Sequence, residues 1–218
     1  MKGLLLKDLY NLSSYKTSLL IMVVIVGFVG FSQENFINLV PIMLTTMLGM
    51  MALSTFSYDE IAKSDKYVLS LPVSKKEMVK EKYLLALLAT LIGVIVSVLL
   101  CVAVSYIVKK QSPDITILLT SSIGAIFGIS LVQCIQIPSV YKWGAERGRI
   151  QMFLLVICVM GIIGGIGYFL LKSGIVGNIE EILKVITSYG MILLIFFTIA
   201  MYIVSYWIAY HIYQKKEV

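Results

Sequence analysis

The sequence is poor in charge and in the side chains that catalyse reactions. Only 14% of its 218 residues are Asp, Glu, Lys or Arg, whereas soluble domains carry about 25%. Its one histidine, His211, excludes HExxH sites and other histidine-dependent metal sites or dyads by count. The chain also lacks the G-x-x-x-x-G-K-[ST] motif of a P-loop. We therefore expect no catalytic residues, and no metal or cofactor bound by this chain.

What the sequence has in abundance is long uncharged runs of apolar residues, which make up 59% of the chain. Six such runs approach the 17 to 25 residues with which a helix crosses about 30 Å of hydrocarbon. They lie at about 17–32, 36–57, 84–108, 115–140, 150–171 and 188–210. We therefore expect an all-α, polytopic membrane protein with six transmembrane helices, forming one domain over residues 1–218.

The absence of charge within these six predicted spans is itself informative. None contains an Asp, Glu, Lys, Arg or His, whereas ion-coupled transporters and proton relays place ionisable groups at membrane depth. If the protein moves a molecule uphill, we expect the energy to come from another chain.

The distribution of lysine and arginine along the chain predicts how the protein is oriented in the membrane. With six spans, 14 of the 18 cationic residues fall on the side that holds both termini and the loops after the second and fourth spans. Because cytoplasmic loops are rich in Lys and Arg, both termini are predicted to be cytoplasmic. The net charge of +6 falls on the same side, where it faces anionic lipid headgroups, and we expect no nucleic-acid partner.

The N-terminal segment MKGLLLKDLYNLSSYK is amphipathic at helical spacing. Leu5, Leu6 and Leu9 share one side, whereas Lys7 and Asp8 share the other. This pattern predicts a short interfacial helix before the first span, with a frayed leader as the alternative.

The stretch YDEIAKSDKYVLSLPVSKKEMVKEKY, residues 58–83, holds eleven of the thirty charged residues. Over residues 58–69 the apolar positions share one arc, which predicts a short helix lying across the cytoplasmic face. Pro72 would end it, and Ser74 with Glu77 would form a capping box that starts a second helix leading into the third span. A solvated loop that only sets topology is the alternative, but a docking surface for a partner accounts better for six lysines, five acids and a defined cap.

A few small or polar residues lie deep within the predicted spans. Gln133 and Gln136 share a helical face, where they could line a pathway or hold a neighbouring helix, and we favour helix packing. Pro138 is expected to kink or end this span. Gly124 and Gly128 are four apart, which predicts close helix packing, more readily within the chain than between subunits.

Two stretches carry a resemblance to a known family. The run YVLSLPVSKKEMVKEKYLL after YDEIAKSDK, and the run IPSVYKWGAERGRI, resemble the first and second cytoplasmic loops of ABC-2 type permeases. These are the membrane subunits of bacterial ABC exporters, and the six-span layout agrees. The resemblance is greatest to small permeases that export amphipathic peptides such as phenol-soluble modulins.

The resemblance implies a separate ATPase subunit that carries ATP and magnesium, a second permease copy, identical or not, and a location in the bacterial cell membrane. It also implies a coupling helix over residues 58–71 that sits in a cleft on the ATPase. The implied contacts are Tyr58, Asp59, Glu60, Ile61, Lys63, Asp65, Lys66 and Tyr67. A secondary cytoplasmic contact would involve Lys142, Trp143, Glu146, Arg147 and Arg149.

The expected function is therefore the permease subunit of an ATP-driven exporter of amphipathic or hydrophobic molecules, with peptides as the expected class. One alternative is the substrate-binding membrane subunit of a vitamin importer, which would retain a vitamin on purification. Another is a non-transporting immunity or scaffold protein, which would have no ATPase partner.

Overall fold

The computed structural model describes residues 2–13, 15–32, 35–62, 74–110, 112–145, 147, 148, 150, 154, 157 and 179–215. These residues are almost entirely helical, and no strand occurs among them. The helices are α1 (Lys2–Ser13), α2 (Lys16–Ser32), α3 (Phe36–Ile61), α5 (Lys75–Val104), α6 (Ile115–Trp143) and α8 (Ile179–Lys215), with a π-helical turn η1 (Ser105–Lys109) extending α5.

Four of these helices are long and apolar enough to cross a membrane: α3, α5 with its extension to Ile107, α6, and α8 from Leu193 to Lys215. Helix α2 has 17 residues, and α1 and α2 together would supply a fifth span bent by 61°. The predicted multi-pass helical fold is thus confirmed. The predicted span at 150–171 lies almost wholly outside the described residues, so the number six stays a prediction.

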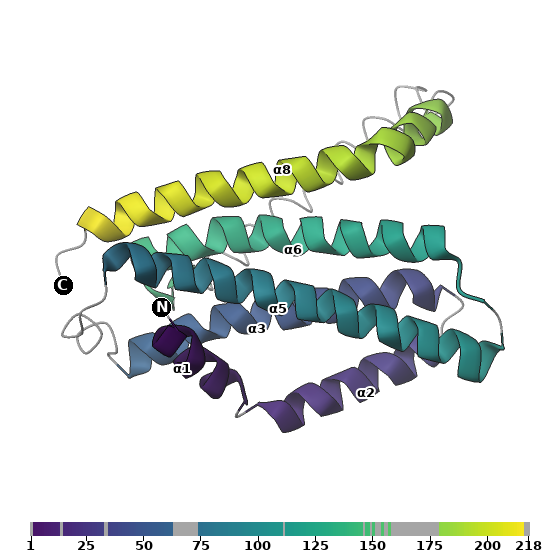
Figure 1. Cartoon of the computed structure of the whole chain (residues 1–218), viewed down its shortest axis with the longest axis horizontal. Coiled ribbons are helices and arrows are strands. Elements are labelled where there is room, and N and C mark those ends of the chain that lie inside the picture. The colour runs from purple at the N-terminus through teal and green to yellow at the C-terminus, as the bar shows by residue number, and fades with distance from the viewer. Residues whose placement is uncertain are drawn as a thin grey trace.

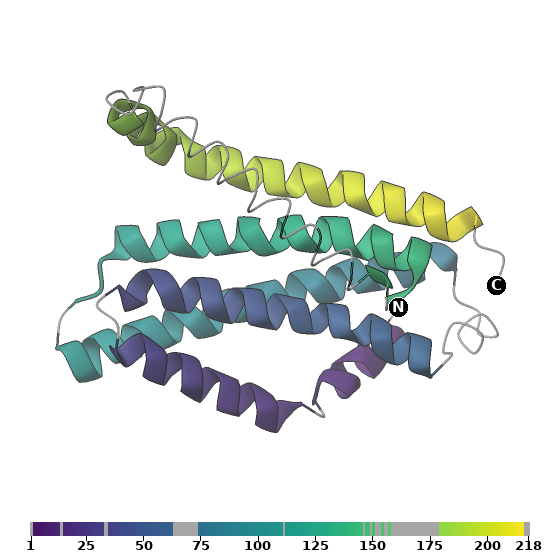
Figure 2. The ribbon, with the colours of Figure 1, turned by 180° about the vertical axis from the view of Figure 1, so that it is seen from behind.

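Helices α3, α5 and α6 pack side by side, and α8 lies along α6 (Figure 1). Helix α2 lies against α3 and α5. The N-terminus and the C-terminus lie at the same end of the bundle in both views (Figures 1 and 2). We call this the terminal end; it also holds the last turn of α3 and the first turn of α5.

Local sequence signals explain where two helices begin. The predicted capping box is present at the start of α5, where Ser74 Oγ accepts from Glu77 N and Glu77 Oε2 accepts from Ser74 N, both at 3.2 Å. Helix α6 begins after Asp114, whose Oδ1 accepts from Thr116 N at 3.0 Å. Both caps satisfy backbone N–H groups that a helix start leaves without partners.

Helices extend beyond three expected boundaries. Helix α6 continues through Pro138 to Trp143, so this proline does not end it, and the helix ends at Gly144, whose φ of 88° suits glycine. Helix α3 continues past the predicted span end to Ile61. The predicted span at 188–210 is part of a longer helix, α8, which begins at Ile179. In each case the helix continues through residues whose composition suggested a break.

Glycines permit close helix contacts at positions other than the predicted pair. A Cβ on Gly49 of α3 would lie 2.5 Å from Ile129 Cγ1 of α6, and one on Gly93 of α5 would lie 3.0 Å from Thr45 Cα of α3. A Cβ added to Gly124 or Gly128 would have no described atom of another helix within 4 Å. No described helix packs closely on this pair, and its packing within the chain stays a prediction, because most of the predicted span at 150–171 lies outside the described residues.

Candidate functional site

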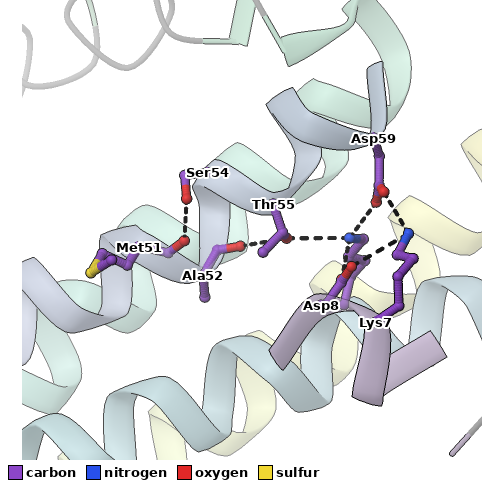
Figure 3. Close-up of polar contacts among 8 residues, drawn as sticks. Lys7, Asp8, Met51, Ala52, Ser54, Thr55 and Asp59 are labelled. Carbon is purple, nitrogen blue, oxygen red and sulfur yellow. Dashed lines mark hydrogen bonds and ion pairs between the residues drawn. The ribbon is translucent and has the colours of Figure 1, made fainter. Parts of the chain in front are cut away.

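Four charged side chains from three helices meet at the terminal end of the bundle. Lys7 and Asp8 come from α1, Asp59 comes from the last turn of α3, and Lys82 comes from the second turn of α5. Figure 3 shows Lys7 and Asp8 pointing toward the side of α3 that carries Asp59 and Thr55. We call these four residues the charge cluster.

The charge cluster is held by short ion pairs. Asp59 bridges two cations, with Oδ1 2.5 Å from Lys7 Nζ and Oδ2 2.5 Å from Lys82 Nζ. Lys82 also pairs with Asp8 and donates to Thr55 Oγ1 at 3.2 Å. The hydroxyl of Thr55 donates in turn to the Ala52 carbonyl at 2.8 Å, which keeps its oxygen turned toward the lysine.

Burial makes these pairs structurally important. The side chains of Asp8 and Lys82 are 0% and 8% exposed, and that of Asp59 is 15% exposed. A buried charge is costly unless it is paired and hydrogen-bonded. Each of these three residues therefore depends on the others, so that α1, α3 and α5 are tied together at this end.

Helix α1 turns its polar side inward to form the charge cluster. Asp8 is fully buried, whereas Leu6 and Tyr10 are 64% and 75% exposed. The polar and apolar sides are those that the sequence predicts. On a water-soluble protein the apolar side of such a helix would face the protein, whereas here it faces outward. A helix whose apolar side faces outward suits the membrane interface.

A second contact joins the ends of α3 and α6. Glu60 Oε2 accepts a hydrogen bond from Ala145 N at 2.6 Å. A side chain on Gly144 would crowd the same carboxylate, because its Cβ would lie 3.0 Å from Glu60 Oε1. The turn after α6 is therefore shaped around Glu60.

A cavity of about 120 Å³ lies beside the charge cluster. Its wall includes Lys7, Asp59 and Lys82 together with Glu60 and Glu81. Glu81 is 3% exposed, and its Oε1 has no hydrogen-bond partner among the described residues. Within the described part of the chain, no group of three or more His, Cys, Asp or Glu side chains is placed to hold a metal ion.

The structure brings together only part of the predicted coupling helix. Residues 58–61 form the last turn of α3, so the separate helix predicted to begin at Tyr58 does not begin there. Asp59 belongs to the charge cluster. The ring of Tyr58 lies 5.9 Å from that of Tyr15, and Ile61 is 79% exposed. The other predicted contacts lie outside the described residues: Lys63, Asp65, Lys66 and Tyr67.

The second predicted contact lies at the same end of the molecule. Lys142, Trp143 and Arg147 are exposed around the end of α6, and Lys142 Nζ lies 4.4 Å from the centre of a Trp143 ring. Glu146 and Arg149 lie outside the described residues. The exposed side chains leave this end of α6 accessible, as a docking surface requires.

The two predicted glutamines have different surroundings. Gln133 is fully buried, donates to Gly49 O at 3.1 Å and to Thr90 Oγ1 at 3.2 Å, and accepts from the hydroxyl of Tyr202. It thus connects α6 to α3, α5 and α8. Gln136 lines a small cavity, and its Oε1 has no hydrogen-bond partner among the described residues. The contacts of Gln133 are those of helix packing, whereas Gln136 Oε1 is hydrogen-bonded to no described polar group.

Sequence reasoning did not identify Asp8 and Lys82 as partners of Asp59. All three lie outside the predicted spans, where charged residues are common and carry no individual signal. The available hint was that α1 places Lys7 and Asp8 on one polar side, which a helix at the membrane interface can turn toward the protein.

Comparison with known proteins gives one match. A family described as ABC-2 family transporter protein matches residues 3–214, which include nearly every residue of the described helices. No curated protein and no solved structure matches the chain significantly.

Proposed function

Because this chain belongs to the ABC-2 transporter family and is thus a membrane subunit of an ABC transporter, we propose that it is the permease of an exporter. Its substrates would be amphipathic or hydrophobic molecules, with peptides as the expected class. The long helices support this proposal, since their middles carry no charged side chain that would favour a small ion.

The observation that carries the proposal is the connection of the two predicted ATPase contacts to the rest of the bundle. Residues 63–73 directly follow the last turn of α3. That turn is tied to α1 and α5 through Asp59, and to the end of α6 through Glu60. An ATPase that pushes on residues 63–73 would therefore displace four helix ends at once.

This proposal gives the charge cluster a mechanical role. Asp59 holds Lys7 and Lys82 with separate oxygen atoms, so a shift of α3 is transmitted to α1 and α5 in the same step. The ATPase would hold ATP and magnesium, and two permease copies, identical or different, would rock about a shared interface. The terminal end would face the cytoplasm of a bacterial cell.

The test uses the full-length chain, purified in mild detergent with the ATPase that accompanies it. The Asp65→Ala, Tyr67→Ala double variant changes the predicted coupling segment, whereas Lys110→Asn is a matched surface change between α5 and α6. Asn suits Lys110 because its φ of 50° is left-handed. We expect ATP hydrolysis to lose its dependence on the permease in the double variant alone.

The opposite outcome has a definite meaning. If the double variant is folded and couples to the ATPase as the wild type does, residues 58–71 are not the coupling element. If no ATPase accompanies either protein, the scaffold alternative gains support. A vitamin retained by the purified chain would favour the importer alternative.

A further inference from the structure

A cavity of about 280 Å³ lies between α5, α6 and α8, separate from the charge cluster. Its wall is made of residues near the middle of each of these helices. Of the described residues that line it, none is charged. The cavity therefore lies at the depth of the hydrocarbon core rather than at the membrane surface.

The wall has two distinct parts. Four hydroxyl-bearing residues form its buried floor, with exposures between 1% and 8%: Thr90, Ser130, Thr198 and Tyr202. Large aliphatic residues form its rim and are about half exposed, as shown by Leu91 at 53% and Ile199 at 55%. A molecule in the cavity would enter past an apolar rim and would meet hydroxyl groups at the floor.

The hydroxyl of Ser130 is the unusual feature of this floor. It is 1% exposed, and its Oγ makes no hydrogen bond among the described residues, although it lies close enough to the Tyr202 hydroxyl to interact with it electrostatically. Other serines of α6 behave differently, since Ser122 donates to Leu118 O and Ser139 donates to Ile135 O, each at 2.7 Å. An unsatisfied polar group is costly in hydrocarbon, so a partner for Ser130 would be favourable.

The other floor hydroxyls already donate elsewhere. Thr198 donates to Leu194 O at 2.7 Å, Thr90 donates to Ala86 O at 2.8 Å, and Tyr202 donates to Gln133. A ligand would therefore find one free donor, Ser130, surrounded by apolar contacts.

We propose that this cavity binds one uncharged amphiphile, with an apolar body and a single hydrogen-bond acceptor that meets Ser130. A cavity of about 150 Å³ holds benzene, so 280 Å³ suits roughly ten to twelve non-hydrogen atoms. The apolar end of a phospholipid tail fills the same space but offers nothing to Ser130. The inference depends on the cavity alone and not on ATP-driven transport.

The experiment measures labelling of the full-length protein in lipid nanodiscs by a photoreactive diazirine analogue of n-decanol, with labelled peptides identified by mass spectrometry. Unlabelled n-decanol, n-decane and decyltrimethylammonium serve as competitors of matched chain length. We expect labels around Ser130 and Thr198, displaced by decanol and much less by the other two.

Two pairs of variants test whether the labelled ligand contacts the floor and the rim of this cavity. Ser130→Ala should reduce labelling about 2- to 10-fold, the effect of one hydrogen bond, whereas Ser139→Ala should not change it. Leu91→Trp, which fills the rim, should abolish labelling. Leu99→Trp is its control, because Leu99 lies on the same helix, is 64% exposed and is not part of the cavity wall.

Three outcomes would overturn the proposal. Equal displacement by decane would make the cavity a plain apolar void, and equal displacement by the cation would contradict selection for an uncharged ligand. Labels spread evenly over exposed residues such as Phe196, Ile203 and Trp207 would indicate lipid-like contact with the whole surface.

Discussion

Glu60 Oε2 accepts a hydrogen bond from Ala145 N at 2.6 Å, which joins the ends of α3 and α6 across 85 residues of sequence. The described parts of the two contacts that the family resemblance implies are therefore adjacent in space. They are better treated as two parts of one surface than as independent sites.

Replacing Glu60 should loosen the turn after α6. In Glu60→Ala, the Ala145 amide loses an ionic acceptor whose contribution is about 1.5–3 kcal/mol. Hydrogen exchange at this amide should become roughly 10- to 100-fold faster. Glu77→Ala, which removes a carboxylate from the start of α5, should leave exchange at Ala145 unchanged, and a slow Ala145 amide in Glu60→Ala would contradict this role.

Removing Lys82 should destabilise the fold more than removing a neighbouring lysine. Lys82→Ala leaves Asp8 and Asp59 with only the partly exposed Lys7 as a cation, and removing one partner of a buried pair costs up to about 3–5 kcal/mol. Lys80→Ala is the control, because Lys80 is exposed on the same helix. Thermal unfolding can be followed by the reaction of buried Cys101 and Cys134 with a thiol-reactive dye, and equal melting temperatures for both variants would be inconsistent with a structural role for the charge cluster.

Two glycine substitutions should have unequal effects. The Cβ of Gly49→Ala would lie 2.5 Å from Ile129 Cγ1, and such overpacking costs about 1–3 kcal/mol. Gly124→Ala meets no described atom within 4 Å, so it should leave the stability nearly unchanged. The same thiol assay distinguishes them, and a larger loss in Gly124→Ala would mean that Gly124 packs against another chain or against residues outside the described part of this one.

The glutamines provide another matched pair. Gln133→Leu removes hydrogen bonds to α3, α5 and α8, and at about 0.6 kcal/mol for each bond within a membrane protein the loss should be roughly 2 kcal/mol. Gln136→Leu should be neutral or slightly stabilising, because Gln136 Oε1 has no described partner. If Gln136→Leu instead abolished transport without loss of stability, Gln136 would belong to a pathway.

Local sequence signals predicted the features that depend on local physics. Apolar runs identified the long helices, and Ser74 with Glu77 identified the start of α5. The end of α3 could not be predicted in this way, because the hydrophobic run stops before Tyr58 whereas the helix does not. Asp59 is stabilised inside the bundle by Lys7 and Lys82, and this pairing depends on residues distant in the sequence.

The predictions for Gly124, Gly128 and Pro138 show the opposite limitation. Small residues four apart permit close packing without specifying which surface uses it, and the close contacts are made by Gly49 and Gly93 instead. Pro138 removes one backbone donor, but helix α6 continues to Trp143. These motifs permit a close helix contact or a helix end, and the arrangement of the neighbouring helices decides whether it forms.

The charge cluster also has a consequence for biosynthesis. All four of its members lie within the first 82 of 218 residues. Once the beginning of α5 has left the ribosome, every partner of Asp59 in the charge cluster has been made, whereas α6 and α8 have not. The ion pairs can therefore form between α1, α3 and the beginning of α5 as an early assembly intermediate, onto which the later helices dock.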